Sequence, residues 1–251
     1  MNCKLCNSVN VNVIASLKHL NHIYTIVFCR NCELLQSREQ HHGISPDYVS
    51  VVPGAIDRNR IWCQGRHKIN AFRQWENDFK FLNSILGRPL RLLDIGCGTG
   101  GFLEYAQNRE FKLFGFDASI AQAEHAARKF PRVMQANSCA EYLNNYGDKE
   151  LIFDIVTLWD VLEHIRNPID YLREISRVLR PGGLVYISTP NGLAKIWKKK
   201  LYDFLPIDFD LNDEFMPWEH VFYYSPRSIH YLLGICGFKV LKVGAVACYK
   251  R

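Results

Sequence analysis

The sequence predicts an α/β protein whose main domain is a doubly wound, mostly parallel sheet. From residue 90 onward, short apolar strands alternate with helices. Strands that are apolar along their whole length are buried on both faces of a sheet, as in parallel α/β folds. Within the same stretch, one strand leads into a glycine-rich turn and then a helix. Two cysteine pairs near the N-terminus predict a small additional module.

The expected elements follow the order that a sheet with helices on both faces requires. Strands are expected at residues 90–95, 113–116, 133–136, 152–158 and 184–188, with one or two closing strands within 238–246. Helices are expected at residues 102–109, 120–129, 169–179 and 228–235, and Pro181-Gly182-Gly183 is expected as a turn. Together they predict a Rossmann-like, seven-stranded, mostly parallel sheet within residues 90–251.

The first 40 residues contain two Cys-x-x-Cys pairs. Cys3 and Cys6 form the first, Cys29 and Cys32 form the second, and a strand-like stretch lies between them at 23–28. A unit this short cannot bury enough apolar area to fold without a staple. The spacing predicts a zinc ribbon with four thiolate ligands, in which the metal is structural because no coordination position stays open. A redox dithiol is the alternative.

The chain therefore divides into three expected parts. A zinc-ribbon module at 1–40 is followed by a helical connector at 41–89, where apolar residues at helical spacing predict a helix over 57–86. The α/β domain occupies 90–251.

Composition excludes several classes of protein. Hydrophobic residues make up 48% and charged residues 22%, which is typical of a globular chain. No run approaches the roughly 20 apolar residues of a membrane-spanning helix, and residues 1–12 lack a signal-peptide core. We therefore expect a cytoplasmic protein. A net charge of +6 is too small to indicate nucleic-acid binding, and nothing in the sequence indicates the oligomeric state.

The glycine-rich turn identifies the expected ligand. Gly96, Gly98 and Gly101 match the G-x-G-x-x-G pattern, which alone does not distinguish a dinucleotide from another nucleoside. Asp94 stands just before the turn, where a carboxylate would repel a pyrophosphate but suit the cationic sulfonium and ammonium of S-adenosylmethionine (SAM). Asp117, at the end of the next strand, is placed to accept hydrogen bonds from ribose hydroxyls. A ligand-free turn is the alternative.

With these features the sequence resembles the class I SAM-dependent methyltransferases. Residues 92–101 resemble their first motif, residues 153–164 their fourth-strand motif, and residues 179–191 the helix, turn and strand that follow. Within the superfamily, the resemblance is greatest to methyltransferases of ubiquinone and sugar biosynthesis. It implies a small polar acceptor, such as a nucleotide sugar, a glycan or a quinone-type precursor.

The resemblance also implies which residues bind the cofactor. The methionine part is expected at Asp94 and the turn, the ribose at Asp117, the adenine near the residues after the second and third strands, and the sulfonium near the end of the fourth strand. The cofactor-binding residues are accordingly Asp94, Gly96, Cys97, Gly98, Gly100, Asp117, Ala118, Asn137, Ser138, Trp159 and Asp160.

The acceptor site is expected near a late Glu-His segment. There His220 is the expected general base and Glu219 its orienting partner, as the resemblance to sugar methyltransferases implies; a packing role for His220 is the alternative. A metal site formed by Asp160, Glu163 and His164 is a further, less favoured interpretation.

A basic amphipathic segment at 195–206 is expected on the substrate side. It predicts peripheral membrane contact or cover for an anionic substrate, with an ordinary solvated helix as the alternative.

Two other functions remain open from the sequence. One is an RNA or protein methyltransferase that uses the zinc ribbon for recognition, although the Asn-Pro-Pro-Tyr-type motif suited to amino-group methylation is absent from the fourth strand. The other is a module that binds the cofactor without catalysis. N-terminal zinc modules also precede the methyltransferase domain in sugar C-methyltransferases, which the sequence resembles in this respect.

Overall fold

The computed structural model describes residues 1–19, 21–38, 75–76, 90–109, 111–204 and 211–244. Two compact units emerge. The first unit combines Met1–Ile44, Asp160–Arg173 and Ser188–Ala245, and the second combines Ser45–Trp159, Glu174–Ile187 and Val246–Arg251. Almost all of the helix expected over 57–86 lies outside the described residues.

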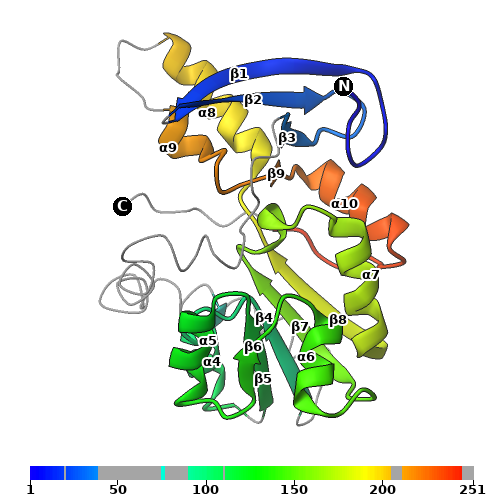
Figure 1. The fold of residues 1–251 in the computed structure, drawn as a ribbon. Helices are drawn as coiled ribbons and strands as arrows, with labels where there is room; N and C mark the ends of the chain where they lie inside the picture. Colours follow the sequence, from blue (N-terminus) through cyan, green and yellow to red (C-terminus); the bar gives the residue numbers. More distant parts are fainter. Residues whose placement is uncertain (20, 39–74, 77–89, 110, 205–210, 245–251) are drawn as a thin grey trace. The chain divides into compact units, whose positions relative to one another are not determined.

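A five-stranded sheet forms the centre of the second unit and confirms the α/β, Rossmann-like fold (Figure 1). Its order is β6-β5-β4-β7-β8, and β4 pairs in parallel with both β5 and β7, as β5 does with β6. The strands are β4 (Leu90–Ile95), β5 (Phe111–Asp117), β6 (Val133–Gln135), β7 (Phe153–Trp159) and β8 (Leu179–Ser188). The five strands expected between residues 90 and 188 thus form, and each bound lies within five residues of its prediction.

Helices cover both faces of this sheet. They are α4 (Gly101–Ala106), α5 (Ile120–Ala127), α6 (Cys139–Tyr146) and α7 (Pro168–Val178), the last of which runs from the first unit into the second. Successive side chains of a strand point to opposite faces. Leu113 of β5 packs in the same cluster as Phe102 of α4, whereas Phe114 packs edge to face on Tyr146 of α6. The sheet is therefore doubly wound, as predicted.

Three local features differ from expectation. α6 was not expected; Ser138 caps its start and Gly147, with φ 82°, ends it. The Pro-Gly-Gly sequence lies inside β8 instead of a separate turn, with Gly182 at φ 73°. Residues 238–244 contain no strand, so the closing strand expected there is wrong for this part of the segment, and its apolar side chains Leu241 and Val243 are exposed where a sheet would bury them. The rest of 238–246 lies outside those residues.

The first unit contains a second, antiparallel sheet of order β1-β2-β3-β9. Its strands are β1 (Val11–His19), β2 (His22–Cys29), β3 (Leu35–Ser37) and β9 (Phe222–Tyr223). β2 contains the strand-like stretch expected at 23–28. Because β3 pairs with β9, the N-terminal segment shares its sheet with residues from the late Glu-His segment.

Three α-helices and one 3-10 turn also lie in the described part of the first unit. They are the 3-10 turn η1 (Leu162–His164), α8 (Gly192–Phe204), α9 (Leu211–Phe215) and α10 (Pro226–Ile235). Phe215 of α9 and Tyr223 of β9 are fully buried in the same cluster as Ile26 and Leu35 of the N-terminal strands. This shared core joins the N-terminal strands to the segment that carries His220.

Candidate functional site

The carboxyl end of the central strand β4 carries a buried carboxyl group. Asp94 is 1% exposed, and its Cα is paired with that of Thr157 in β7. This pairing places the Thr157 hydroxyl beside Asp94, where it donates a 2.7 Å hydrogen bond to Oδ1. Burial raises the pKa of Asp94 to about 8, although the bond from Thr157 lowers it. Burial outweighs the hydrogen bond, so this carboxyl group would be stabilised by a nearby cation.

A second carboxyl group, that of Asp117, lies at the end of β5. Its Oδ2 accepts a hydrogen bond from the Gly98 backbone at 2.8 Å, and its Oδ1 accepts one from the Ser119 backbone at 2.8 Å. Burial raises the pKa of Asp117, and these two bonds lower it. Each oxygen has a further lone pair, so the fixed carboxylate can still accept hydrogen bonds from hydroxyl groups.

The glycine turn connects the two carboxyl groups. Gly96, Gly98 and Gly100 have φ values of 66°, 56° and 87°, a region that residues with a Cβ rarely adopt. The backbone N–H groups of Gly96 and Cys97 both donate to the Phe116 carbonyl, which ties the turn to β5. The local sequence therefore leaves bare backbone beside Asp94 and Asp117, as the glycine pattern predicts.

Trp159 and Ala118 are two further residues of the second unit that are expected to contact the cofactor. The Trp159 ring packs against Phe102 and Tyr186, and its buried Nε1 has no hydrogen-bond partner within the described part of the chain. The Ala118 carbonyl accepts a bond from the Gln135 amide at 3.4 Å. Trp159 therefore offers a donor that a ligand could satisfy.

Asn137 and Ser138 both stabilise the start of α6. The Asn137 side chain donates to Glu141 Oε2 at 3.1 Å, and the Ser138 hydroxyl accepts a bond from the Glu141 backbone at 3.1 Å. These contacts give both residues a capping role. Contact of either residue with adenine stays a prediction.

Asp160 directly follows β7 and belongs to the first unit. Its φ of 52° lies in the left-handed region, which costs energy for a residue with a side chain. Its backbone N–H donates to the Ser188 carbonyl at 2.9 Å, and the Ser188 hydroxyl lies 3.5 Å from its Oδ1. Burial raises the pKa of the Asp160 carboxyl.

The structure brings Glu163, His164 and His220 together within the first unit. One possible ligand atom of each lies within 4.8 Å of those of the others. Burial raises the pKa of Glu163 to about 8, with a further contribution from the negative charge of Asp160. Burial lowers the pKa of His164 and lowers that of His220 to about 2. Both rings are therefore neutral at physiological pH.

The environment of His220 bears on its expected role as a base. The ring is 6% exposed, and its Nδ1 has no hydrogen-bond partner among the described residues, so Glu219 does not orient the ring through that atom. A ring whose pKa is about 2 holds a transferred proton weakly. General-base catalysis by His220, with Glu219 as its partner, stays a prediction.

The four N-terminal cysteines converge as their spacing predicts. All four Sγ atoms lie within 4.8 Å of one another, with 3.5 Å between Cys3 and Cys32 and 3.6 Å between Cys6 and Cys29. All four are free thiols.

Each cysteine pair forms the same backbone turn. The residue after each pair, Asn7 or Glu33, has a positive φ of 57° or 62°. Its N–H donates to the carbonyl of the first cysteine of the pair, at 2.9 Å for Cys3 and 2.8 Å for Cys29. The cluster therefore consists of two matching turns that face each other.

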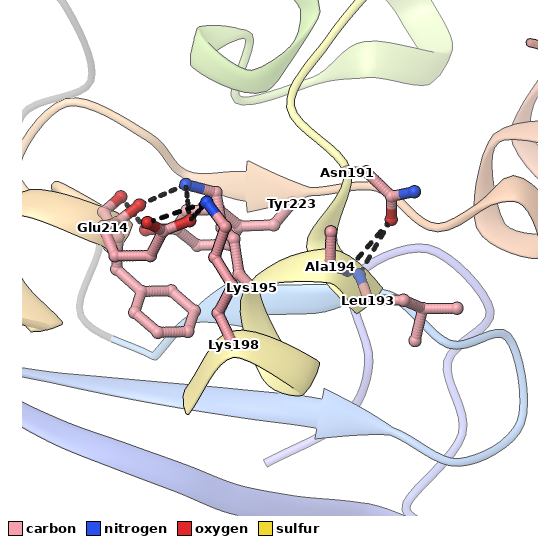
Figure 2. Close-up of polar contacts among 8 residues, drawn as sticks. Asn191, Leu193, Ala194, Lys195, Lys198, Glu214 and Tyr223 are labelled. Carbon is pink, nitrogen blue, oxygen red and sulfur yellow. Dashed lines mark hydrogen bonds and ion pairs between the residues drawn. The ribbon is translucent and has the colours of Figure 1, made fainter. Parts of the chain in front are cut away.

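The basic segment expected at 195–206 begins in α8, where Asn191 caps the helix and two lysines converge on Glu214 (Figure 2). Lys195 is buried with its Nζ 3.7 Å from the Glu214 carboxylate, and Lys198 Nζ lies 3.1 Å from the same carboxylate, so the two lysines share one internal counter-charge. Trp197 and Leu201 are exposed. In the part of the chain that the structure describes, no helix combines the length and apolar character needed to cross a membrane. Peripheral membrane contact by this segment stays a prediction.

Comparison with known proteins identifies the family. The family model described as a methyltransferase domain matches residues 66–243, more than half of the chain. The chain belongs to the methyltransferase family. This membership and the fold confirm the resemblance to class I SAM-dependent methyltransferases.

Two curated relatives are named ubiquinone biosynthesis O-methyltransferase. The protein from Caulobacter sp. (strain K31) is 35% identical over 127 residues, which cover 47% of this chain and 50% of that protein. The protein from Aeromonas salmonicida (strain A449) is 32% identical over 137 residues, which cover 52% and 55%. The chain thus spans about half the length of the curated relatives it matches.

Solved structures of methyltransferases share the fold. Magnesium protoporphyrin IX methyltransferase from Synechocystis PCC 6803, with bound SAH, superposes with a TM-score of 0.57 at 17% identity, covering 81% of this chain and 92% of that one. The plantazolicin methyltransferase in complex with SAH has a TM-score of 0.52 at 18% identity, covering 75% and 71%.

Sequence reasoning missed two contacts at the candidate sites, those of Thr157 with Asp94 and of Glu163 with His220. Thr157 lies in the middle of an apolar strand, and only the parallel register reveals that it faces Asp94. Glu163 and His220 are far apart in the chain, so their proximity follows from the tertiary fold. A polar residue within an otherwise apolar buried strand was the available signal for Thr157.

The Thr157 contact predicts a pH-dependent effect on stability. Asp94 has a raised pKa in the folded protein, so its ionisation opposes folding increasingly as pH rises from its unfolded value toward about 8. The variant Thr157→Val removes the hydroxyl that favours the ionised form. We expect urea unfolding to show a loss of about 1–3 kcal/mol, larger at about pH 9 than at about pH 6. Thr157→Ser retains the hydroxyl and should recover most of the loss; equal effects of both variants would contradict the assignment.

Proposed function

We propose that the chain transfers a methyl group from SAM to a small polar acceptor. The observation that carries the proposal is the pair of buried carboxyl groups, Asp94 and Asp117, on either side of a glycine turn at the carboxyl ends of β4 and β5. Ligands of open parallel sheets bind at this edge. The buried Asp94 carboxyl favours a cationic ligand and disfavours a diphosphate, which supports SAM over a dinucleotide, whereas Asp117 suits the ribose of either.

The residues present fit this cofactor. The Asp94 carboxyl is proposed to face the cationic methionine part, with Gly96, Cys97, Gly98 and Gly100 supplying the backbone beside it. Asp117 is proposed to accept hydrogen bonds from the ribose, near Ala118. The unpartnered Trp159 Nε1 supports the placement of a polar ligand atom there. The proposed roles of Asn137 and Ser138 near the adenine, and of Asp160 near the sulfonium, rest on the family resemblance.

The proposed reaction is a direct displacement. SAM supplies a methyl group already activated by its sulfonium. The protein's part is to hold acceptor and donor in line and to exclude water. Of the acceptors expected from the sequence, a quinone-type precursor with a hydroxyl group has additional support, because the two curated relatives are named as ubiquinone biosynthesis O-methyltransferases.

Binding of SAM should be coupled to ionisation of Asp94. A cation stabilises the ionised carboxyl, so below a pKa of about 8 binding should release a proton and affinity should increase with pH. We expect an increase of up to about tenfold per pH unit between roughly pH 6 and 8, measured by calorimetry in buffers of different ionisation enthalpy. Asp94→Asn should weaken binding and remove the pH dependence, whereas exposed Asp148→Asn should behave as wild type. Unchanged binding by Asp94→Asn would contradict the assignment.

The acceptor class can be tested directly. The protein is incubated with methyl-labelled SAM and, separately, with hydroxylated quinone precursors, nucleotide sugars, RNA and protein. We expect label in the quinone-precursor arm. Label confined to nucleotide sugars would preserve the small-acceptor proposal and shift its class. Label only in RNA or protein would overturn it, and SAM binding without any transfer would indicate a non-catalytic module.

We further propose that Cys3, Cys6, Cys29 and Cys32 bind a structural zinc ion. Zn–S bonds of about 2.3 Å place the sulfur atoms of a tetrahedral site roughly 3.8 Å apart. The observed separations of 3.5 and 3.6 Å are close to that value. The two matching turns leave all four sulfur atoms facing one centre, and the Asn31 amide donates to Cys6 Sγ at 3.5 Å, which would stabilise a thiolate. The donor set is that of a closed structural site.

Loss of one sulfur should release the zinc. We expect X-ray absorption of the purified protein to show zinc with sulfur ligands. Cys29→Ser should lose this signal and several kcal/mol of stability, on the order of a structural zinc site's folding contribution. Cys236→Ser, in which the replaced thiol is buried outside the cluster, is the matched control. A wild-type protein whose zinc lacks sulfur ligands would contradict the proposal.

A further inference from the structure

We propose that Glu163, His164 and His220 form a second metal site, which binds a divalent transition-metal ion through two imidazoles and one carboxylate. The three residues come from η1 and from the segment before β9, both in the first unit. The site is separate from the cysteine cluster, since it has no sulfur ligand.

The convergence of the three side chains is the first observation. One possible ligand atom from each lies within 4.8 Å of the other two, and the two rings meet edge to face with centroids 4.8 Å apart. Glu163 is 1% and His220 is 6% exposed. Polar side chains this deeply buried are normally paired with one another or with a ligand.

The Glu163 carboxylate has one oxygen held and one unpartnered. Its Oε2 accepts a hydrogen bond from the Thr189 hydroxyl at 3.0 Å. Its Oε1 is buried and has no hydrogen-bond partner among the residues that the structure describes. A buried carboxylate oxygen without a partner is costly, and coordination of a cation is one way to satisfy it.

The His164 ring is oriented by the protein backbone. Its Nδ1 lies 2.9 Å from the carbonyl oxygen of Glu219, which can only accept a hydrogen bond, so Nδ1 carries the proton. With the proton on Nδ1, Nε2 of the neutral ring has a lone pair; the Asp160 backbone is a second and weaker partner of the ring. A carbonyl that holds the far nitrogen of a ring is the usual outer partner of a metal-binding histidine.

The His220 ring has the same arrangement with its nitrogens exchanged. The ring forms a hydrogen bond to the backbone of Phe215, while its buried Nδ1 has no partner among the described residues. The bond to Phe215 therefore comes from Nε2–H, and the free lone pair is on Nδ1. Each of the three side chains thus uses one polar atom for an outer contact and has a second polar atom available for a metal ion.

The donor set selects the class of metal. Imidazole and carboxylate together suit zinc, iron(II), cobalt(II) and related ions, whereas calcium and magnesium prefer oxygen ligands alone. Three protein ligands leave at least one coordination position for an exchangeable ligand. Asp160, which the sequence suggested as a ligand with Glu163 and His164, bonds instead with Ser188, and His220 completes the set.

This inference deepens the proposed function, on which its catalytic meaning rests. A hydroxyl group on the acceptor is a suitable exchangeable ligand, because a metal ion lowers the pKa of a coordinated hydroxyl. One lone pair cannot hold a metal ion and accept a proton at once. Metal ligation would therefore replace the general-base role expected for His220.

The experiment uses the full chain with its cysteine cluster loaded with zinc and Co²⁺ as the probe. Thiolate ligands give Co²⁺ an intense charge-transfer band, which nitrogen and oxygen ligands do not. We expect one equivalent of Co²⁺ to bind with ligand-field bands only. Failure to bind Co²⁺, or a bound ion with thiolate charge transfer, would overturn the proposal.

Three variants assign the site. His220→Gln should lower the Co²⁺ affinity by more than about 100-fold, since it removes a ligand. Thr189→Val removes only the hydroxyl that holds Glu163 and should lower the affinity by roughly 10- to 100-fold. His230→Gln changes an exposed histidine of α10 and should bind Co²⁺ as wild type does. Equal affinity in all three variants would contradict the assignment, and thermal unfolding of each variant checks that it is folded.

The test of the metal site is independent of the test of the proposed reaction. Co²⁺ binding is measured without SAM or acceptor, so its loss in His220→Gln supports the site even if no methyl transfer is found. Transfer that persists at full rate after metal removal would support a direct role for the protein's own groups, and the Co²⁺ titration would still decide whether the site exists.

Discussion

The burial of the Asp94 carboxyl at the end of a parallel strand is the constraint on which the account of the second unit depends. A hydroxyl from β7 and a glycine turn that begins immediately after β4 surround this group, and its pKa is raised to about 8. A fold that only needed stability would gain from an apolar residue here, because a buried charge without a counter-charge is costly. A cationic ligand would offset this cost by stabilising the ionised carboxyl. The proposed preference for SAM therefore follows from the parallel register that buries Asp94.

The first unit follows similar chemistry with different donors. Its four cysteines place their Sγ atoms around one centre, and backbone hydrogen bonds fix the two turns that carry them. In the cluster of Glu163, His164 and His220, the Thr189 hydroxyl holds one Glu163 oxygen and the Glu219 carbonyl holds His164 Nδ1. The pairing of β3 with β9 links the two parts of this unit, because the N-terminal strands and the segment around His220 share one core. The N-terminal segment therefore contributes to the fold around His220 as well as to its own proposed zinc site.

The sequence predicted the features that depend on local pattern. Apolar runs marked the parallel strands, glycines marked the turn at 96–100, and cysteine spacing marked the convergence of four thiols. It did not reveal contacts that depend on register or on distant segments. The Thr157 bond to Asp94 requires knowledge of which residues of β4 and β7 are paired, and the meeting of Glu163 with His220 requires the tertiary fold. The prediction of closing strands within 238–246 was wrong for the described residues 238–244. An alternating apolar pattern does not by itself show that a neighbouring strand is present to pair with.

The central claim is that the buried Asp94 carboxyl beside a glycine turn favours a sulfonium nucleoside over a diphosphate. Isothermal titration calorimetry of the full chain with SAM, with SAH and with NAD tests it most directly. We expect SAM and SAH to bind at a single site, to compete with each other, and NAD to give no measurable heat at the same concentrations. Tight binding of NAD together with no binding of SAM or SAH would contradict the account.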